Sequence, residues 1–114
     1  MQVLVKRVYD APEGADGYRV LVDRVWPRGR TKEQVAAAEW LKDVGPSTGL
    51  RRWFGHDPER FEEFAARYRA ELDGNPAVEQ LRRIVAAQPT VTLVYGAKDE
   101  QHNQAVVLRE YLTA

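Results

Sequence analysis

Two apolar segments, one near each end of the chain, most constrain the fold. Residues 18–26 (YRVLVDRVW) and 90–96 (TVTLVYG) are rich in β-branched and aromatic residues, which is typical of strands. In the first segment Val20, Leu21 and Val22 follow one another without a polar residue between them. Such a run indicates burial on both faces, as in a sheet covered by helices. The second segment predicts another interior strand.

The rest of the chain supplies two further strands and the helices that would cover the sheet. The remaining strands are predicted at 3–9 and 39–44. Five helices are predicted, over 31–38, over 48–54, and from Pro58, Pro76 and Asp99 onward. The resulting order is β-β-α-β-α-α-α-β-α. It favours an α/β fold with a small mixed, mostly parallel sheet of about four strands and helices on both faces.

Capping residues mark where several helices begin. Asp57 and Asn75 each stand directly before a proline, and Asp99 is expected to cap the final helix. From Pro58 onward the apolar residues recur at helical spacing and form one face, made of Phe61, Phe64, Ala65, Tyr68 and Leu72. We therefore expect the phenylalanines of this face, together with Trp53, to be structural.

Length, charge and residue usage narrow the class of protein. The 114 residues suit a single domain over 1–114. The N-terminal residues lack the pattern of a signal peptide, and no run of about 18 apolar residues predicts a membrane span. A cytoplasmic protein is expected. The 17 basic and 17 acidic residues cancel, which makes nucleic acid an unexpected partner.

The sequence also lacks the residues of several kinds of site. It has no cysteine, and therefore no thiolate nucleophile or cysteine-based zinc site. Its two histidines, His56 and His102, are too few for a dedicated metal site, and the His56-Asp57 pair does not change this. No nucleotide-loop or serine-hydrolase motif occurs. We expect neither a metal nor a cofactor.

The candidate binding residues lie in two loops that follow strands, because open α/β sheets bind ligands beyond the carboxyl ends of their strands. In the loop 24–29, Arg24 and Arg28 flank Trp26 and could clamp a phosphorylated or planar ligand. The alternative is that Arg24 pairs with Asp23 or another carboxylate while Trp26 only packs.

The second loop, 96–103, follows the last strand and leads into the final helix. Lys98 would add positive charge there, and Tyr95 could stack on an organic ring. His102 would fall in the first helical turn, where the helix dipole keeps an imidazole neutral and able to accept a proton. His102 is the candidate catalytic residue. The alternative is that His102 is a solvent-exposed polar residue without a catalytic role.

Five segments of the chain, in this order, resemble the YeaO-like family of bacterial and archaeal proteins. They are KRVYD (6–10), GYRVLVDRVWPRG (17–29), the LK of EWLKDVGPST (39–48), WFGHDPERFEEFAARYRAEL (53–72) and VTLVYGAKDEQHNQAVVL (91–108). The resemblance implies a small cytosolic α/β protein of unassigned biochemistry. The family pattern centres on the segments DRVWPRG, WFGHDP and AKDEQHN, and the resemblance extends to His56 and Asp57 in the second of them. It implies a functional pocket between the two loops and adds Asn103 to the candidate binding residues.

Two functions from different classes remain open at this stage. In the first, the protein is an enzyme or binder of an anionic, phosphate- or nucleotide-like small molecule held by Arg24, Arg28 and Lys98. In the second, the same arginines and Trp26 form a regulatory protein-binding patch, since Trp and Arg are favoured anchors of such patches. A third and weaker hypothesis is single-stranded nucleic acid stacked on Trp26.

Overall fold

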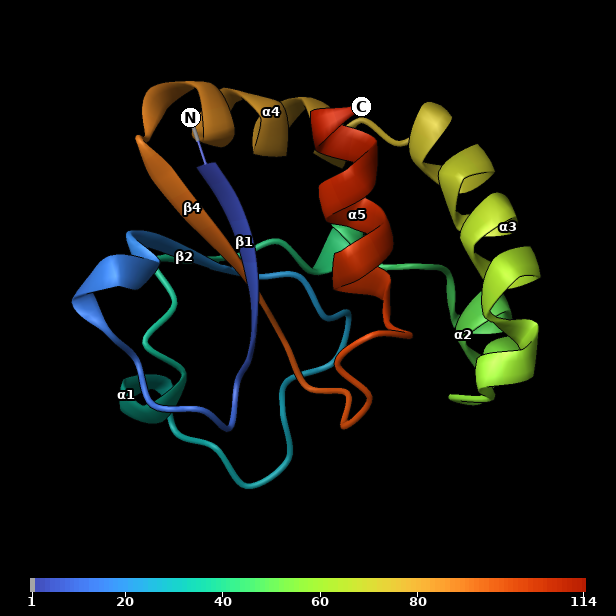
Figure 1. The fold of residues 1–114 in the computed structure, drawn as a ribbon, viewed down its shortest axis with the longest axis horizontal. Coiled ribbons are helices and arrows are strands. Elements are labelled where there is room, and N and C mark those ends of the chain that lie inside the picture. The colour runs from blue at the N-terminus through green and yellow to red at the C-terminus, as the bar shows by residue number, and fades with distance from the viewer. Residues whose placement is uncertain (1) are drawn as a thin grey trace.

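Strand β4 (Thr90–Tyr95) lies inside the sheet of the computed structural model, which describes residues 2–114. It pairs in parallel with β1 (Gln2–Arg7) on one side and with β2 (Tyr18–Leu21) on the other. The two-residue β3 (Glu39–Trp40) continues the sheet beyond β2, giving the order β1-β4-β2-β3. Figure 1 shows β1, β4 and β2 in the left half of the view. The α/β prediction is confirmed, and every pairing among the described residues is parallel.

The helices bury the sheet unequally on its two faces. They are α1 (Lys32–Val35), α2 (Thr48–Phe54), α3 (Phe61–Asp73), α4 (Ala77–Ala87) and α5 (Gln104–Thr113). In Figure 1, α5 stands to the right of β1, α3 lies further to the right, and α4 runs across the upper end of the strands. Within residues 2–114, none of these helices is long and apolar enough to cross a lipid bilayer.

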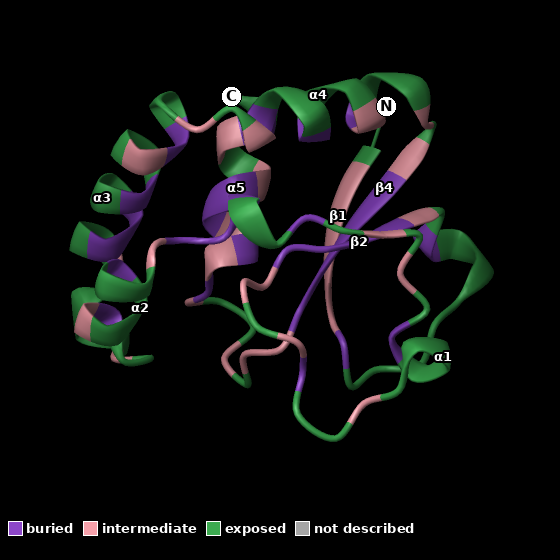
Figure 2. Cartoon of the chain, turned by 180° about the vertical axis from the view of Figure 1, so that it is seen from behind, coloured by how far each residue is buried: buried purple, intermediate pink, exposed green. Residues whose placement is uncertain are grey.

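Alternate residues of β4 serve two separate cores. Val91, Leu93 and Tyr95 are buried in the larger core, together with apolar residues of α2, α3, α4 and α5. Val94 points the other way, into a small cluster that includes Val35 of α1. Figure 2 shows the buried surfaces of α3 and α5 facing inward. The sheet is therefore covered on both faces, as the apolar runs predicted, but α1 contributes only a single turn to the second face.

Several predicted elements are shorter in the structure. The helix expected over 31–38 begins as predicted, because the Thr31 hydroxyl accepts a hydrogen bond from the backbone N–H of Gln34 at 3.1 Å. It ends after one turn, at Ala36, which adopts a left-handed conformation with φ of 50°. The strand expected over 39–44 covers only Glu39–Trp40, since residues 42–44 form a 3-10 turn.

The start of the final helix was predicted wrongly. The cap of α5 is Asn103, whose side chain accepts a hydrogen bond from the Val106 N–H. Asp99 instead closes a tight turn by accepting bonds from the N–H groups of Gln101 and His102. His102 therefore precedes the helix rather than lying in its first turn. Asp57 caps the chain at Pro58 as predicted, because its side chain accepts a bond from the Glu59 N–H, but residues 58–60 form a 3-10 turn and α3 begins at Phe61. Asn75 lies one residue before Pro76, which is the cap position of α4, and its side chain accepts a bond from the Ala77 N–H.

Phe64 is the core residue whose removal we expect to cost most on α3. Its side chain is 1% exposed and stacks on Phe54 with ring centroids 4.2 Å apart, whereas Phe61 is only partly buried. Truncating a buried phenylalanine costs about 3–5 kcal/mol, a large part of the 5–15 kcal/mol typical of a domain. Urea unfolding of Phe64→Ala should show a loss of this size and Phe61→Ala a smaller one. Equal and small losses would contradict this packing.

Candidate functional site

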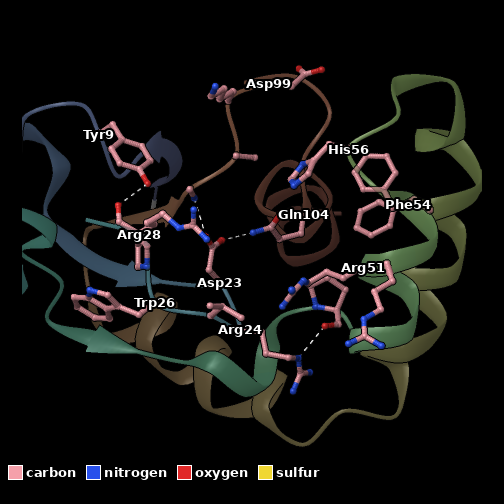
Figure 3. Close-up of a pocket in the computed structure, with 18 residues that line it drawn as sticks. Tyr9, Asp23, Arg24, Trp26, Arg28, Arg51, Phe54, His56, Asp99 and Gln104 are labelled. Atoms are coloured by element: carbon pink, nitrogen blue, oxygen red, sulfur yellow. Dashed lines mark hydrogen bonds between the residues drawn. The ribbon is translucent and has the colours of Figure 1, made fainter. Parts of the chain in front are cut away.

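A pocket of about 680 Å³ opens at the carboxyl ends of β1, β4 and β2. Tyr9 follows β1, residues 23–28 follow β2 and residues 96–99 follow β4. Because parallel strands end at the same edge of a sheet, their following loops meet there. Figure 3 shows these loops around the pocket, with α2 and the start of α5 completing the wall. The two loops singled out from the sequence thus lie at one pocket.

Arg24 is fixed by backbone carbonyls. Its Nε donates a hydrogen bond to the Pro46 carbonyl at 2.9 Å, and its Nη2 donates to the Gly45 carbonyl at 2.8 Å. The expected alternative, pairing with Asp23, is wrong, since the two bonds that Arg24 makes go to the 45–46 turn. The guanidinium holds that turn against the pocket while remaining part of its lining.

Trp26 lines the pocket but is held on its other sides. Its indole N–H donates to the Arg30 carbonyl at 2.7 Å, and its ring meets the Trp40 ring edge-on with centroids 5.3 Å apart. The side chain is half-buried. Trp26 is therefore a fixed part of the wall rather than a freely exposed ring.

Positive charge gathers in this pocket without partners. The five basic residues that line it are Arg24, Arg28, Arg51, Arg52 and Lys98. Among residues 2–114, no carboxylate oxygen lies within 4.0 Å of any of them, although ion pairs form elsewhere on the chain. Apart from Arg24, their side chains also make no hydrogen bond within that range. The exposed cationic groups are thus available to a ligand.

Asp23 is a half-buried carboxylate in the pocket lining. Its Oδ2 accepts a hydrogen bond from the backbone N–H of Gly96 at 2.9 Å, and its Oδ1 accepts one from the side-chain amide of Gln104. Burial raises the pKa of Asp23 to about 6, while these two bonds and the charge of Arg51 oppose the rise. Figure 3 shows the carboxylate between β2 and the start of α5.

His56 enters the same pocket from the end of α2. It follows Gly55, which ends α2 in a left-handed conformation, and its own φ is also positive, at 59°. A positive φ is uncommon for a residue with a side chain, and histidine tolerates it better than most. The consecutive left-handed residues turn the chain sharply, and the His56 ring lies in the pocket lining.

The other predicted site residues lie outside the pocket lining. Tyr95 and Asn103 are each 1% exposed, and Asn103 is occupied as the helix cap. His102 places its Nδ1 2.8 Å from Asp99 Oδ2, and its ring meets Phe61 edge-on with centroids 5.1 Å apart. Of the predicted site residues, the structure therefore places Arg24, Trp26, Arg28 and Lys98 together in the pocket lining. The other three lie outside it.

Sequence reasoning missed several polar and charged residues that line the pocket. Asp23 was considered only as a partner for Arg24, although it directly follows the buried run 20–22. Arg51 and Arg52 were not among the candidate binding residues, because nothing local indicates that α2 turns them toward the strand ends. Gln104 gives no signal in the sequence. Its role depends on how α5 is placed over Asp23.

A family model and individual relatives both match nearly the whole chain. Residues 2–114 match the model described as "Inactive DUF488-N3 subclade". The chain is 41% identical to the uncharacterized protein YeaO of Escherichia coli over 112 residues, which cover 98% of this chain and 97% of YeaO. It is 43% identical over 111 residues to an uncharacterized protein of Mycobacterium tuberculosis, covering 97% and 93% of the two chains. No solved structure matches at a significant level.

The pKa of Asp23 predicts how its replacement changes stability with pH. Asparagine can keep the bond from Gly96 and can pair with Gln104 if that amide rotates by half a turn. Between pH 6 and 4 the folded protein holds a proton on Asp23 that the unfolded chain releases, so acidification favours the fold of the parent. The parent should therefore gain stability relative to Asp23→Asn on going from pH 7 to pH 4, by up to about 3 kcal/mol.

The check is a series of urea unfolding curves for both proteins across this pH range. Other titrating groups are shared by the two proteins and cancel in the difference between their free energies of unfolding. A difference that stays constant from pH 7 to pH 4 would contradict the raised pKa.

Proposed function

We propose that this chain, which belongs to the YeaO-like family and to the inactive DUF488-N3 subclade, binds an anionic small molecule in the pocket between residues 24–29 and 96–99. The observation that carries the proposal is the set of five basic residues lining one pocket without a carboxylate within ion-pairing distance in the described chain.

The charge of the pocket differs from the charge of the whole chain. Overall the basic and acidic residues cancel, with 17 of each. In the pocket five basic residues face two carboxylates, Asp23 and Asp99. A concave wall with an excess of one sign concentrates the field and attracts ligands of the opposite charge. Guanidinium groups in particular match the oxygen geometry of phosphate and carboxylate.

Size and lining favour a small organic anion. The volume of about 680 Å³ lies within the range of about 300–1,000 Å³ that is usual for small-molecule sites. Val25 and Trp26 give the pocket lining accessible apolar surface, and the buried residues Pro46, Phe54 and Phe64 complete its apolar part. An inorganic ion would leave this apolar surface unused, whereas a phosphorylated organic compound would cover it.

Binding without turnover fits the chain better than catalysis does. The family model carries the description "inactive", and the pocket lining contains no serine, threonine or cysteine that could act as a nucleophile. His102, the residue proposed from the sequence for proton transfer, is directed at Asp99 and Phe61 instead of the pocket. The remaining imidazole of the chain, His56, would then serve as a hydrogen-bonding or charged group for the anion.

A protein-binding patch is the second candidate function, and one observation favours it. Val25 and Trp40 are 57% and 40% exposed, and Trp40 packs against Trp26 at the side of the pocket. Exposed apolar groups beside arginines are common at protein interfaces. We rank this candidate lower because Trp26 is half-buried and hydrogen-bonded at its indole N–H.

A thermal-shift series tests the anion pocket. A phosphorylated ligand at about 100 times its Kd stabilises the native state by about 2.7 kcal/mol, which should raise the Tm of a domain of this size by about 10 °C. We expect such a response from at least one nucleotide or sugar phosphate, measured at fixed ionic strength with chloride as the control. Arg28→Ala should abolish it while keeping its own unliganded Tm.

The matched control is Arg83→Ala, which removes an exposed arginine of α4 that does not line the pocket. It removes the same charge and should respond as the parent does. If no phosphorylated compound shifts the parent, or if Arg28→Ala and Arg83→Ala respond alike, the anion pocket is excluded and the protein-binding patch becomes the better account.

His102→Ala separates the pocket from the neighbouring turn. Because the His102 ring lies outside the pocket, we expect this variant to bind the same ligand with an unchanged Kd. Its free energy of unfolding should fall by no more than about 1 kcal/mol, since it loses two partly exposed contacts, with Asp99 and with the Phe61 ring. Loss of ligand binding in a folded His102→Ala protein would show that the site extends beyond Asp99 to residues 100–103.

A further inference from the structure

The pocket contains a feature that a site for a simple anion would not need. Asp23 places a carboxylate among five basic side chains, in the lining of the cavity. A bare anion would be repelled by this group. Burial raises the pKa of Asp23 to about 6, so the carboxylate is still mainly ionised at neutral pH. A ligand that enters the pocket must therefore accommodate a negative charge as well as several positive ones.

The carboxylate is held in a defined orientation, with acceptor capacity to spare. An ionised carboxylate offers about four acceptor sites. Protein contacts use one on each oxygen, through the Gly96 N–H and the Gln104 amide. These bonds come from two different elements, the end of β4 and the first residue of α5. They fix the plane of the group and leave its remaining lone pairs for a donor in the pocket.

Gly96 makes this position of the carboxylate possible. A Cβ added at Gly96 would lie 2.9 Å from Asp23 Oδ2, closer than such atoms approach in real proteins. The loop after β4 therefore leaves room for the Asp23 side chain to approach its backbone. The glycine of the opposite pocket loop differs, since a Cβ at Gly29 would meet nothing within 4 Å.

We propose that Asp23 is a specificity-determining residue that accepts a hydrogen bond from a hydroxyl group of the ligand. The ligand class is then a phosphate ester that also carries free hydroxyls, the chemistry shared by sugar phosphates and nucleotides. The cations bind the phosphate and Asp23 selects among phosphate esters. This inference rests on the anion pocket proposed above and adds the second group that a ligand must have.

Hydrogen-bond energetics support selection by a carboxylate. A bond to a charged group contributes more than a neutral bond, and a buried acceptor that loses access to water without gaining a donor is unfavourable. A phosphate ester without hydroxyls would cover Asp23 and leave its carboxylate with neither water nor a donor. A hydroxylated ester would donate a hydrogen bond to it. Carboxylates near strand ends of open parallel sheets bind ribose hydroxyls in this way in other proteins.

Two esters of matched size and charge test the inference by calorimetric titration. The probes are ribose 5-phosphate and cyclopentylmethyl phosphate, which share a five-membered ring and a phosphate monoester but differ in hydroxyl groups. The parent should bind ribose 5-phosphate at least about tenfold more tightly, as expected for one charged hydrogen bond. In Asp23→Asn the ratio should fall to within about threefold, with cyclopentylmethyl phosphate bound as well as before or better.

A merely structural role of Asp23 would give a different result. If Asp23 only joins β4 to α5, its replacement weakens both esters equally and the ratio of the two affinities does not change. Arg83→Ala serves as the control, because it removes an exposed charge on α4 that does not line the pocket. We expect it to retain the preference for ribose 5-phosphate.

The possible outcomes separate this inference from the proposed function. If the parent binds both esters equally, or if Asp23→Asn keeps the tenfold preference, Asp23 is not the selecting group and the anion pocket remains. If the parent binds neither ester, the inference about Asp23 fails, and the thermal-shift series with other phosphorylated compounds decides whether the anion pocket stands. Should Asp23→Asn not fold, the ratio measured with the parent alone still decides, since equal affinities overturn the inference and a tenfold preference supports it.

Discussion

The parallel pairing of β4 with β1 and β2 is the constraint on which the rest of the structure depends. Residues 91–95 are all buried, so β4 is stable only when it is covered by strands at both edges and by apolar groups on both faces. That arrangement brings together three strand ends that are far apart in the sequence. The pocket loops after β1, β2 and β4 meet because these strand ends lie together, and α2 packs against the larger core beside them.

The pocket is shaped mainly by bonds to the backbone. Arg24 holds the 45–46 turn through two carbonyls, Asp23 holds the start of the 96–99 loop through the Gly96 N–H, and Trp26 is anchored to Arg30. These contacts fix the walls before any ligand is present. The basic groups that point into the cavity are left without carboxylate partners in the described chain, an arrangement that favours binding of an anion more than it favours stability.

Much of the fold could be predicted from local sequence, but the site could be predicted only in part. Apolar runs, helical spacing and caps such as Asp57 and Asn75 act over a few residues, and they gave the correct order of elements. The start of α5 was missed because Asp99 and Asn103 are both good caps, and tertiary packing chooses between them. The roles of Asp23, Arg51 and Gln104 depend on contacts between distant segments, which no local pattern encodes.

The most direct measurement is an NMR titration of the ¹⁵N-labelled protein with ribose 5-phosphate at constant ionic strength. The account predicts saturable changes in the backbone amide signals of residues 24–28 and 96–99, with a single Kd at all of them. Signals from α4, which does not line the pocket, should stay in place. Changes that do not saturate, or that are as large on α4 as at the strand ends, would contradict a specific anion pocket at this edge of the sheet.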